Sequence, residues 1–194
     1  DEYSQVRLKR MTHAWRRRQL PSIVTHDMTY DAEDAVLGKL RTCNLVNLPD
    51  DPVKVVFHPE FMSSTSPLIG LDYDEFVRGC HLGVFPSYYE PWGYTPMECA
   101  ALGVPAITSD LAGFGGYVQR TIPDHDAKGM FVLERRYTSF DASAEQLTAL
   151  MQQVLLAERR DRIDLRNRVE ALSVQFDWNE LARNYWAAHE LALT

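Results

Sequence analysis

The chain has 194 residues, which is enough for one sizeable hydrophobic core. Its composition, 45% hydrophobic and 24% charged, is ordinary for a globular protein, and its formal net charge of −7 argues against nucleic-acid binding as its main function. No apolar run approaches the roughly 20 residues of a membrane-spanning helix, and the charged start, DEYSQVRLKR, is not that of a signal peptide. We therefore expect neither a membrane nor a nucleic acid among its partners.

The three cysteines indicate a cellular compartment. Cys43, Cys80 and Cys99 are an odd number, and their spacing is not that of a metal site. Such cysteines are typical of buried free thiols in the reducing cytosol. We therefore predict a cytoplasmic protein whose cysteines bind no metal.

The first twenty residues predict a basic N-terminal helix, which we treat as a segment of its own, residues 1–20. Apolar residues interrupt a basic stretch there, and Arg16, Arg17 and Arg18 form a run of positive charge. A charge run of this kind is typical of a solvated helix face.

From residue 21 onward, short apolar runs alternate with segments of helical spacing. The runs are typical of strands covered on both faces, and they lie at 22–25, 53–57, 82–85, 105–108 and 130–133. The helical segments between them lie at 31–40, 72–80 and 95–102. Strands that alternate with helices favour a parallel, doubly wound sheet. The predicted fold class is therefore α/β, with a Rossmann-like sheet and flanking helices.

The last part of the chain predicts a helical extension. After Asp141 the apolar spacing is helical to the end, in three helices at about 141–157, 158–173 and 178–192. We accordingly divide the rest of the chain into a sheet domain at 21–140 and an extension at 141–194.

Ligands of open parallel sheets bind beyond the carboxyl ends of the strands. That rule directs attention to the segments after Phe57, Phe85 and Thr108. Phe85 is followed by PSYYEPWGYTPMECAALG, which contains the least ordinary residues of the chain. We expect the candidate site in this segment.

The string TPME within this segment predicts a helix start. Thr95 is the expected N-cap, Pro96 the first helical residue and Glu98 the third. Gly93 permits close approach of a ligand to the backbone, and the free amide groups of such a helix start can bind a diphosphate. Every crossover helix of a parallel sheet has such an end, so this signal alone is weak.

Glu90 and Glu98 are the candidate ligand-binding carboxylates. Glu90 lies in the loop before the helix, between aromatic residues and Pro91. Aromatic side chains beside a carboxylate commonly line sugar sites. Glu98 can accept hydrogen bonds from a ribose diol. As an alternative that needs no ligand, it is a capping-box glutamate that reaches back to the N–H of Thr95.

The segment from Gly79 to Gly116, GCHLGVFPSYYEPWGYTPMECAALGVPAITSDLAGFGG, is very similar to glycogen synthases of the fungal and animal type. The similarity extends upstream to Val53 and downstream through Arg135 and Arg136 to FDWNELARNYW, so it covers nearly the whole chain. Two glutamates at this spacing would indicate only a broad set of retaining glycosyltransferases, whereas EPWGYTP in this surround is far more specific.

The resemblance implies an enzyme of two Rossmann-like domains that face a cleft, the glycosyltransferase-B arrangement. The second domain of such an enzyme binds the nucleotide-sugar donor. The implied reaction transfers glucose from UDP-glucose to the 4-hydroxyl of a growing α-1,4-glucan with retention, and needs no metal or other cofactor. The implied partners are UDP-glucose, the α-glucan acceptor, the N-terminal domain of the same enzyme and, as a candidate, further copies of the protein.

The chain would be the C-terminal, donor-binding part of such an enzyme. The family has an acceptor-side domain and then a basic strand and loop before this point, and we find neither. We therefore expect residues 21–140 to be an incomplete nucleotide-sugar-binding domain, and the 194 residues to transfer no glucose unaided.

By motif position, the resemblance implies that Glu90 is the catalytic residue beside the transferred glucose and that Glu98 binds the ribose hydroxyls. Tyr73 would stack on uracil, or it is an ordinary aromatic residue at a helix start. The sequence leaves open whether Glu90 is a nucleophile or supports positive charge, although one carboxylate fits better with front-face substitution. The other implied substrate-binding residues are Trp92, Gly93, Tyr94 and Thr95.

Two further segments have two interpretations each. The glycine-rich run at 112–116, AGFGG, shapes the cleft wall or simply forms a turn. Arg159, Arg162 and Arg166 share a helical face and resemble the arginine cluster that senses glucose 6-phosphate in eukaryotic relatives, so they are a candidate regulatory phosphate site. Alternatively, the helix is a surface of i,i+4 ion pairs, namely Glu158 with Arg162 and Asp164 with Arg168.

Other functions remain open at this point. One is a starch-type or sucrose-forming glycosyltransferase of the same architecture, with a different donor or acceptor. The other is a non-catalytic module that binds a nucleotide or mediates oligomerisation. The presence of both Glu90 and Glu98 favours an enzyme over such a module.

Overall fold

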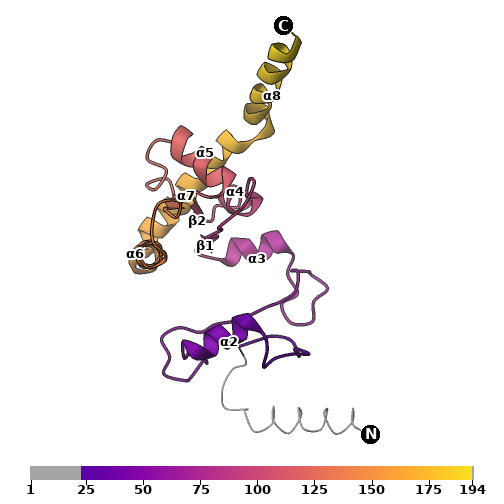
Figure 1. Ribbon diagram of the computed structural model, residues 1–194, viewed down its shortest axis with the longest axis vertical. Coiled ribbons are helices and arrows are strands. Elements are labelled where there is room, and N and C mark those ends of the chain that lie inside the picture. Colours follow the sequence, from indigo (N-terminus) through magenta and orange to yellow (C-terminus); the bar gives the residue numbers. More distant parts are fainter. Residues whose placement is uncertain (1–22, 194) are drawn as a thin grey trace. The chain divides into compact units, whose positions relative to one another are not determined.

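The computed structural model describes residues 23–193 (Figure 1). The chain divides between Gly70 and Leu71 into two compact units, and each is described by itself. The helix predicted at 1–20, with its run of three arginines, lies outside the described residues.

Among the described residues of the first unit, 23–70, there is one helix, α2 (Ala35–Thr42). It begins four residues later than the pattern suggests because Asp34 is the N-cap, whose carboxylate accepts a hydrogen bond from the N–H of Leu37 at 2.9 Å.

The strands predicted at 22–25 and 53–57 meet only in a single parallel bridge, between Val24 and Phe57. The expectation that they are covered on both faces is wrong, since Val53 is 56% exposed and Val56 is 67% exposed. Two short segments joined by a single bridge do not form a sheet face large enough to bury such side chains.

The second unit contains a three-stranded parallel sheet in the order β1 (Gly83–Val84), β2 (Ala106–Ser109) and β3 (Met130–Leu133). Gly83 pairs with Ala106, and Ala106 pairs with Met130. Every residue of β2 and β3 is buried. This confirms the predicted α/β class and shows why the runs lack polar alternation, since both faces of the sheet are covered.

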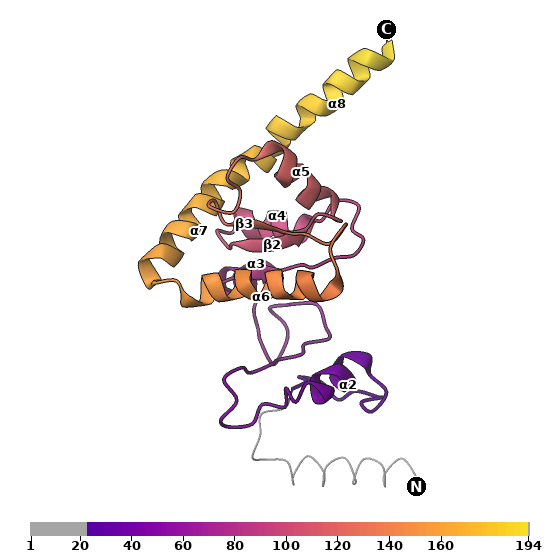
Figure 2. The same cartoon turned by 60° about the vertical axis from the view of Figure 1, so that its left-hand side comes forward.

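Alternate residues of the strands contribute to two hydrophobic clusters, one on each face. Figure 2 shows α6 (Phe140–Leu156) along one side of β2 and β3, and α4 (Tyr94–Ala101) and α5 (Gly113–Thr121) on the other. Ile107, Phe131 and Leu133 pack with Val154 of α6. The opposite cluster joins the sheet to α4, α5 and α7 (Arg159–Ser173) through residues that include Ala106, Met130, Val132, Phe114 and Val118.

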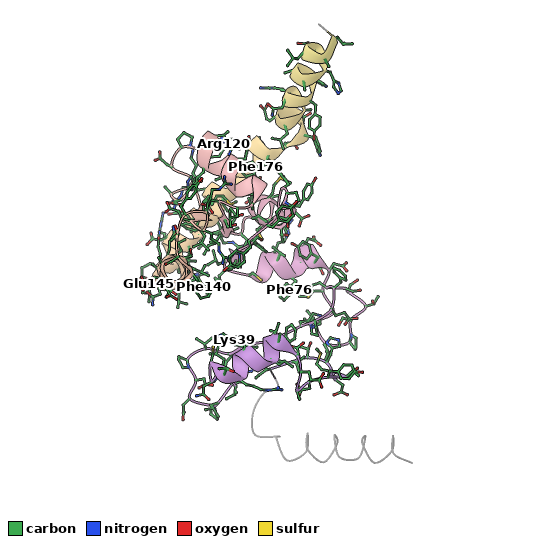
Figure 3. All side chains as sticks on the ribbon, in the orientation of Figure 1. Lys39, Phe76, Arg120, Phe140, Glu145 and Phe176 are labelled. Carbon is green, nitrogen blue, oxygen red and sulfur yellow. The ribbon has the colours of Figure 1, made fainter. Side chains whose placement is uncertain are left out.

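With the exception of α5, the helices around the sheet lie close to their predicted positions. α3 (Tyr73–Gly79) begins with a capping box, in which the Glu75 carboxylate accepts from the N–H of Asp72 at 3.1 Å. The C-terminal helices are α6, α7 (Arg159–Ser173), the short 3₁₀ turn η1 (Val174–Phe176) and α8 (Trp178–Leu193). Figure 3 labels Phe176 of η1, whose ring packs against that of Phe114 in α5 at 4.9 Å between centroids. The domain boundaries expected at residues 20 and 140 stay predictions, although α6 and α7 belong to the same compact unit as the sheet.

The glycine-rich run at 112–116 is not the turn that simple turn chemistry predicts. It forms the first turn of α5, a helix absent from the sequence prediction. A Cβ atom at Gly113 would lie 2.1 Å from the carbonyl oxygen of Pro91, and one at Gly115 would lie 2.0 Å from that of Ser109. The glycines therefore permit α5 to approach the backbone of β2 and of the preceding loop.

The cysteines differ in burial. Cys99 is 2% exposed and Cys80 is half-buried, but Cys43 is exposed, so the expectation of a buried thiol is wrong for Cys43. In the part of the chain from 23 to 193, no helix combines the length and the apolar composition that crossing a membrane requires.

Candidate functional site

The segments that follow the three strands are tied together at the carboxyl edge of the sheet. The Ser109 hydroxyl, at the end of β2, donates to the carbonyl of Ser87, which follows β1, at 2.6 Å. Asp110 accepts hydrogen bonds from the backbone N–H groups of Arg135, at 2.9 Å, and Arg136, at 3.2 Å, which follow β3. Ligands of open parallel sheets bind at this edge, and the segment chosen from the sequence lies there, so the site stays a prediction with a defined position in the fold.

Glu90 lies in a loop whose backbone is fixed by the start of α5. Its carbonyl accepts from the N–H of Gly113 at 3.0 Å, and the carbonyl of Trp92 accepts from the N–H of Phe114 at 2.7 Å. The Glu90 side chain is half-buried and lies against Gly93, because a Cβ atom built on Gly93 would be 3.3 Å from Cγ of Glu90. Glu90 and Gly93 are thus brought together, as the predicted site requires.

Gly93, rather than Thr95, is the N-cap of α4. Gly93 has the left-handed backbone conformation, with φ 103° and ψ 80°, and no side chain caps the helix. Thr95 is instead the second helical residue, so its predicted capping role is wrong. Glycine adopts this conformation without steric cost, so the loop can end at Gly93 and the helix can begin at Tyr94. The first N–H groups of α4 are therefore left without a side-chain acceptor.

Glu98 does not take part in a capping box. It is the fifth residue of α4, and the first turn of that helix contains no acidic residue. Glu98 is exposed and lies beside Tyr73 of α3. Burial, followed by the charge of the Glu98 carboxylate and hydrogen bonding to it, raises the pKa of Tyr73 to about 12. The structure therefore joins two of the predicted substrate-binding residues.

The remaining predicted residues lie on two sides of the start of α4. Trp92, Tyr94 and Glu98 line a mainly apolar groove of about 930 Å³, which α5, η1 and α8 complete. The Trp92 ring packs on Phe114, at 5.7 Å between ring centroids, and is half-buried. Gly93 is buried, and neither it nor Thr95 lines this groove. Glu90, on the loop side, does not line it either.

Three arginine side chains of α7 bind backbone carbonyls instead of neighbouring carboxylates. Arg162 donates to the carbonyl of Ala157 at 2.6 Å, and Arg168 donates to that of Ala127 at 2.7 Å. Arg166 donates to the carbonyls of Cys80 and Arg78, at the C-terminal end of α3. Among the ion pairs of residues 23–193, neither of the two predicted for this helix forms.

The regulatory phosphate site stays a prediction. Arg159 is exposed, whereas the guanidinium groups of Arg162 and Arg166 are already engaged with carbonyl oxygens. Each guanidinium has further N–H groups besides those that bind the main-chain carbonyls. A phosphate at this face would therefore bind to these remaining N–H groups of Arg162 and Arg166.

Comparison with known proteins identifies the family. The family model described as "Glycogen synthase" matches residues 1–194, the whole of the chain. The chain belongs to the glycogen synthase family.

The curated relatives are members of this family from fungi and animals. The chain is 52% identical over 192 residues to glycogen [starch] synthase isoform 2 of Saccharomyces cerevisiae and 50% identical over 188 residues to glycogen [starch] synthase of Caenorhabditis elegans. It is 49% identical over 187 residues to the liver glycogen [starch] synthase of Mus musculus. These matches cover 96–97% of this chain but only 27–28% of the relatives, so the chain spans about a quarter of their length.

A solved structure of WaaG, a glycosyltransferase involved in lipopolysaccharide biosynthesis, resembles this family member at a TM-score of 0.46. The match has 17% sequence identity and covers 75% of this chain and 31% of that one. Similarity at this level says nothing about activity.

The sequence pattern did not single out two residues at the carboxyl edge of the sheet in this glycogen synthase family chain. Asp110 accepts the hydrogen bonds that fix the segment after β3, and the Arg135 guanidinium carbon lies 3.6 Å from the centroid of the Tyr88 ring. The carboxyl-edge rule already covered the segment of Asp110, which follows β2, and it would have included Arg135 had it also been applied to Leu133 at the end of β3. Within the described residues, no three His, Cys, Asp or Glu side chains gather in an arrangement able to bind a metal ion.

Proposed function

We propose that the whole protein is a cytoplasmic glycosyltransferase that transfers glucose from UDP-glucose to the 4-hydroxyl of an α-1,4-glucan with retention. In this proposal the chain supplies the donor-binding part, and an N-terminal domain supplies the acceptor side. Membership of the glycogen synthase family supports the proposal. The observation that carries it is the left-handed Gly93, which opens an uncapped helix directly beside the Glu90 carboxylate.

The start of α4 suits the diphosphate of the donor. The first N–H groups of an α-helix have no partner within the helix, and the helix dipole makes this end positive. In α4 no side chain satisfies them, and Gly93 lets a ligand approach the backbone. The two negatively charged phosphates of the donor would bind at the fixed N–H groups of Tyr94 and Thr95.

The reaction would break the bond between C1 of glucose and the diphosphate oxygen, and form a bond between C1 and O4 of the glucan. The proton of the attacking hydroxyl would pass to the departing phosphate oxygen on the same face. Fixed N–H groups stabilise the charge that develops on the diphosphate without reorganising, and one such donor contributes about 3 kcal/mol in other enzymes. In this scheme the Glu90 carboxylate supports the positive charge of the oxocarbenium-like hexose.

Two residues would bind the nucleoside. Glu98, with its exposed carboxylate, would accept hydrogen bonds from the ribose diol, and the Tyr73 ring beside it would stack on uracil. The ordinary pKa of 10.0 already keeps the Tyr73 hydroxyl neutral at physiological pH, and the raised pKa of about 12 extends that state to higher pH, so the hydroxyl can donate a hydrogen bond.

The Glu90→Gln variant of the full-length enzyme tests the catalytic role. We expect kcat to fall about 100-fold to 1000-fold, as when one charge-stabilising group is removed elsewhere, while KM for UDP-glucose changes little. The matched control is Glu98→Gln, which should raise KM for UDP-glucose more than it lowers kcat. Near-wild-type turnover by Glu90→Gln would reject the role assigned to this carboxylate. Turnover with ADP-glucose but not UDP-glucose would point to a starch-type enzyme.

A further inference from the structure

Arg135 joins the segment after β3 to the loop that carries Glu90. Its Nη1 donates a hydrogen bond to the carbonyl of Pro86, and its guanidinium lies over the Tyr88 ring, 3.6 Å from the ring centroid. Its own backbone N–H donates to the Asp110 carboxylate at 2.9 Å. Arg135, which itself follows β3, therefore contacts the segments that follow β1 and β2.

The loop is also held at its other end. The start of α5 binds the carbonyl of Glu90 through Gly113 and that of Trp92 through Phe114. The Ser109 hydroxyl holds the carbonyl of Ser87. Contacts therefore hold the loop on both sides of Glu90. Those made by Arg135 are to residues that precede Glu90 in the sequence.

The contacts that Arg135 makes are those of a planar guanidinium. Such a group can stack on an aromatic face while its N–H groups donate in the same plane, and a lysine ammonium cannot do both. None of the ion pairs found in residues 23–193 involves Arg135. Its side chain therefore serves the loop rather than a neighbouring carboxylate.

We propose that Arg135 is a positioning residue for glucosyl transfer, which holds the loop from Pro86 to Glu90 so that the Glu90 carboxylate meets the hexose. The inference rests on the proposed role of Glu90. Arg135 acts through the loop, and the nucleoside residues Tyr73 and Glu98 do not depend on it.

The first test is the Arg135→Lys variant of the full-length enzyme. A misplacement of about 1 Å can cost as much as roughly 100-fold in rate, and for this partial loss of support we expect kcat to fall about 10-fold. KM for UDP-glucose should change less than about 2-fold, because the residues proposed to bind the nucleotide are untouched. The matched control is Arg136→Lys, which should leave kcat unchanged. The Arg136 side chain donates to the carbonyl of Asp110 at 3.3 Å and not to the loop from Pro86 to Glu90. An unchanged kcat in Arg135→Lys would overturn the inference.

The decisive test repeats Arg135→Lys in the Glu90→Gln enzyme. If Arg135 acts through Glu90, its replacement should have little further effect there, because the group that it positions is already gone. An equal fold-loss in both backgrounds would overturn the inference while leaving the proposed function intact. Failure of the proposed function would look different, since Glu90→Gln alone would then keep near-wild-type turnover.

Tyr88 tests the same contact from the other side and covers the case in which Arg135→Lys fails to fold. Tyr88→Phe keeps the aromatic face and should keep kcat within about 2-fold, whereas Tyr88→Ala removes it and should lower kcat with KM unchanged. Equal turnover of Tyr88→Ala and Tyr88→Phe would show that the stacking does not position the loop.

Discussion

The two compact units of the chain are stabilised by different interactions. Among the described residues of the first unit, Leu37 is the one buried hydrophobic side chain, whereas residues 71–193 contain two hydrophobic clusters around a buried sheet. The first unit relies instead on polar side chains that bind the backbone, such as Asn47 with Val55. In a segment with few apolar contacts, little buried apolar surface offsets the desolvation of buried polar groups. Each of these groups therefore needs a hydrogen-bond partner of its own.

A second polar cluster in the first unit lies after the bridged residues Val24 and Phe57. The Thr25 hydroxyl is 2.8 Å from Nδ1 of His26 and 2.9 Å from Nδ1 of His58. Nε2 of His26 lies 2.8 Å from the Glu60 carboxylate. These bonds join the two segments, whereas the apolar runs of the second unit pair as a sheet whose two faces pack against helices.

The largest expected effect tests the core of the second unit. Phe114→Ala should destabilise the chain by about 3–5 kcal/mol, because Phe114 is fully buried and its ring packs against Phe176 at 4.9 Å between centroids. Chemical denaturation followed by tryptophan fluorescence measures the loss. The control is Phe140→Ala, at a position that is 69% exposed and should change stability little. Equal losses in both variants would contradict the assignment of this core.

A smaller effect tests the polar support of the first unit. The Asn47 side chain is 2% exposed and makes two 2.8 Å hydrogen bonds with the backbone of Val55. Asn47→Ala leaves both backbone groups unpaired, so we expect a local loss of about 2 kcal/mol, measured as faster hydrogen–deuterium exchange at Val55.

The control for Asn47 is Asn44→Ala. Both Asn47 and Asn44 have a positive φ, 59° and 56° respectively, but Asn47 is buried whereas Asn44 is exposed. The alanine at 44 should therefore show only the cost of the left-handed conformation, about 1 kcal/mol. Equal effects of the two variants on exchange at Val55 would show that the hydrogen bonds of Asn47 contribute nothing.

The smallest effect compares a buried thiol with an exposed one. Burial, followed by the charges of Cys80 and Glu98, raises the pKa of Cys99 to about 11 from the ordinary 9.0. Between these values the unfolded chain loses the proton while the folded chain keeps it. The contribution of Cys99 to stability is therefore present below pH 9 and is lost as pH rises to 11.

In wild type the free energy of unfolding should decrease between pH 9 and pH 11, and in Cys99→Ala this decrease should be smaller by on the order of 1 kcal/mol. Chemical denaturation at pH 8, 9.5 and 11 measures the difference. Cys43→Ala removes a thiol that is exposed in the first unit and should leave the slope unchanged. The same slope in wild type and Cys99→Ala would contradict the raised pKa.

Several elements could be predicted because the signal for them is local. β3 coincides with the run at 130–133, and the three C-terminal helices begin and end within about two residues of their apolar spacing. The candidate site was only partly predictable. The loop of Glu90 could be located from its place after a strand, but the N-cap was assigned to Thr95 because the backbone of Gly93 cannot be read from a residue pattern.

The sequence by itself determined the parallel α/β class, the helical end of the chain and the segment in which the candidate site lies. These depend on the periodicity of neighbouring residues and on strand ends. Only the tertiary structure decided that Gly113 and Gly115 begin a closely packed helix, that Tyr73 lies beside Glu98, and that Arg135 holds the loop of Glu90. The physical reason is that each of these contacts joins segments distant in the sequence, and their distance is set by how the helices and strands pack together, which no local pattern encodes.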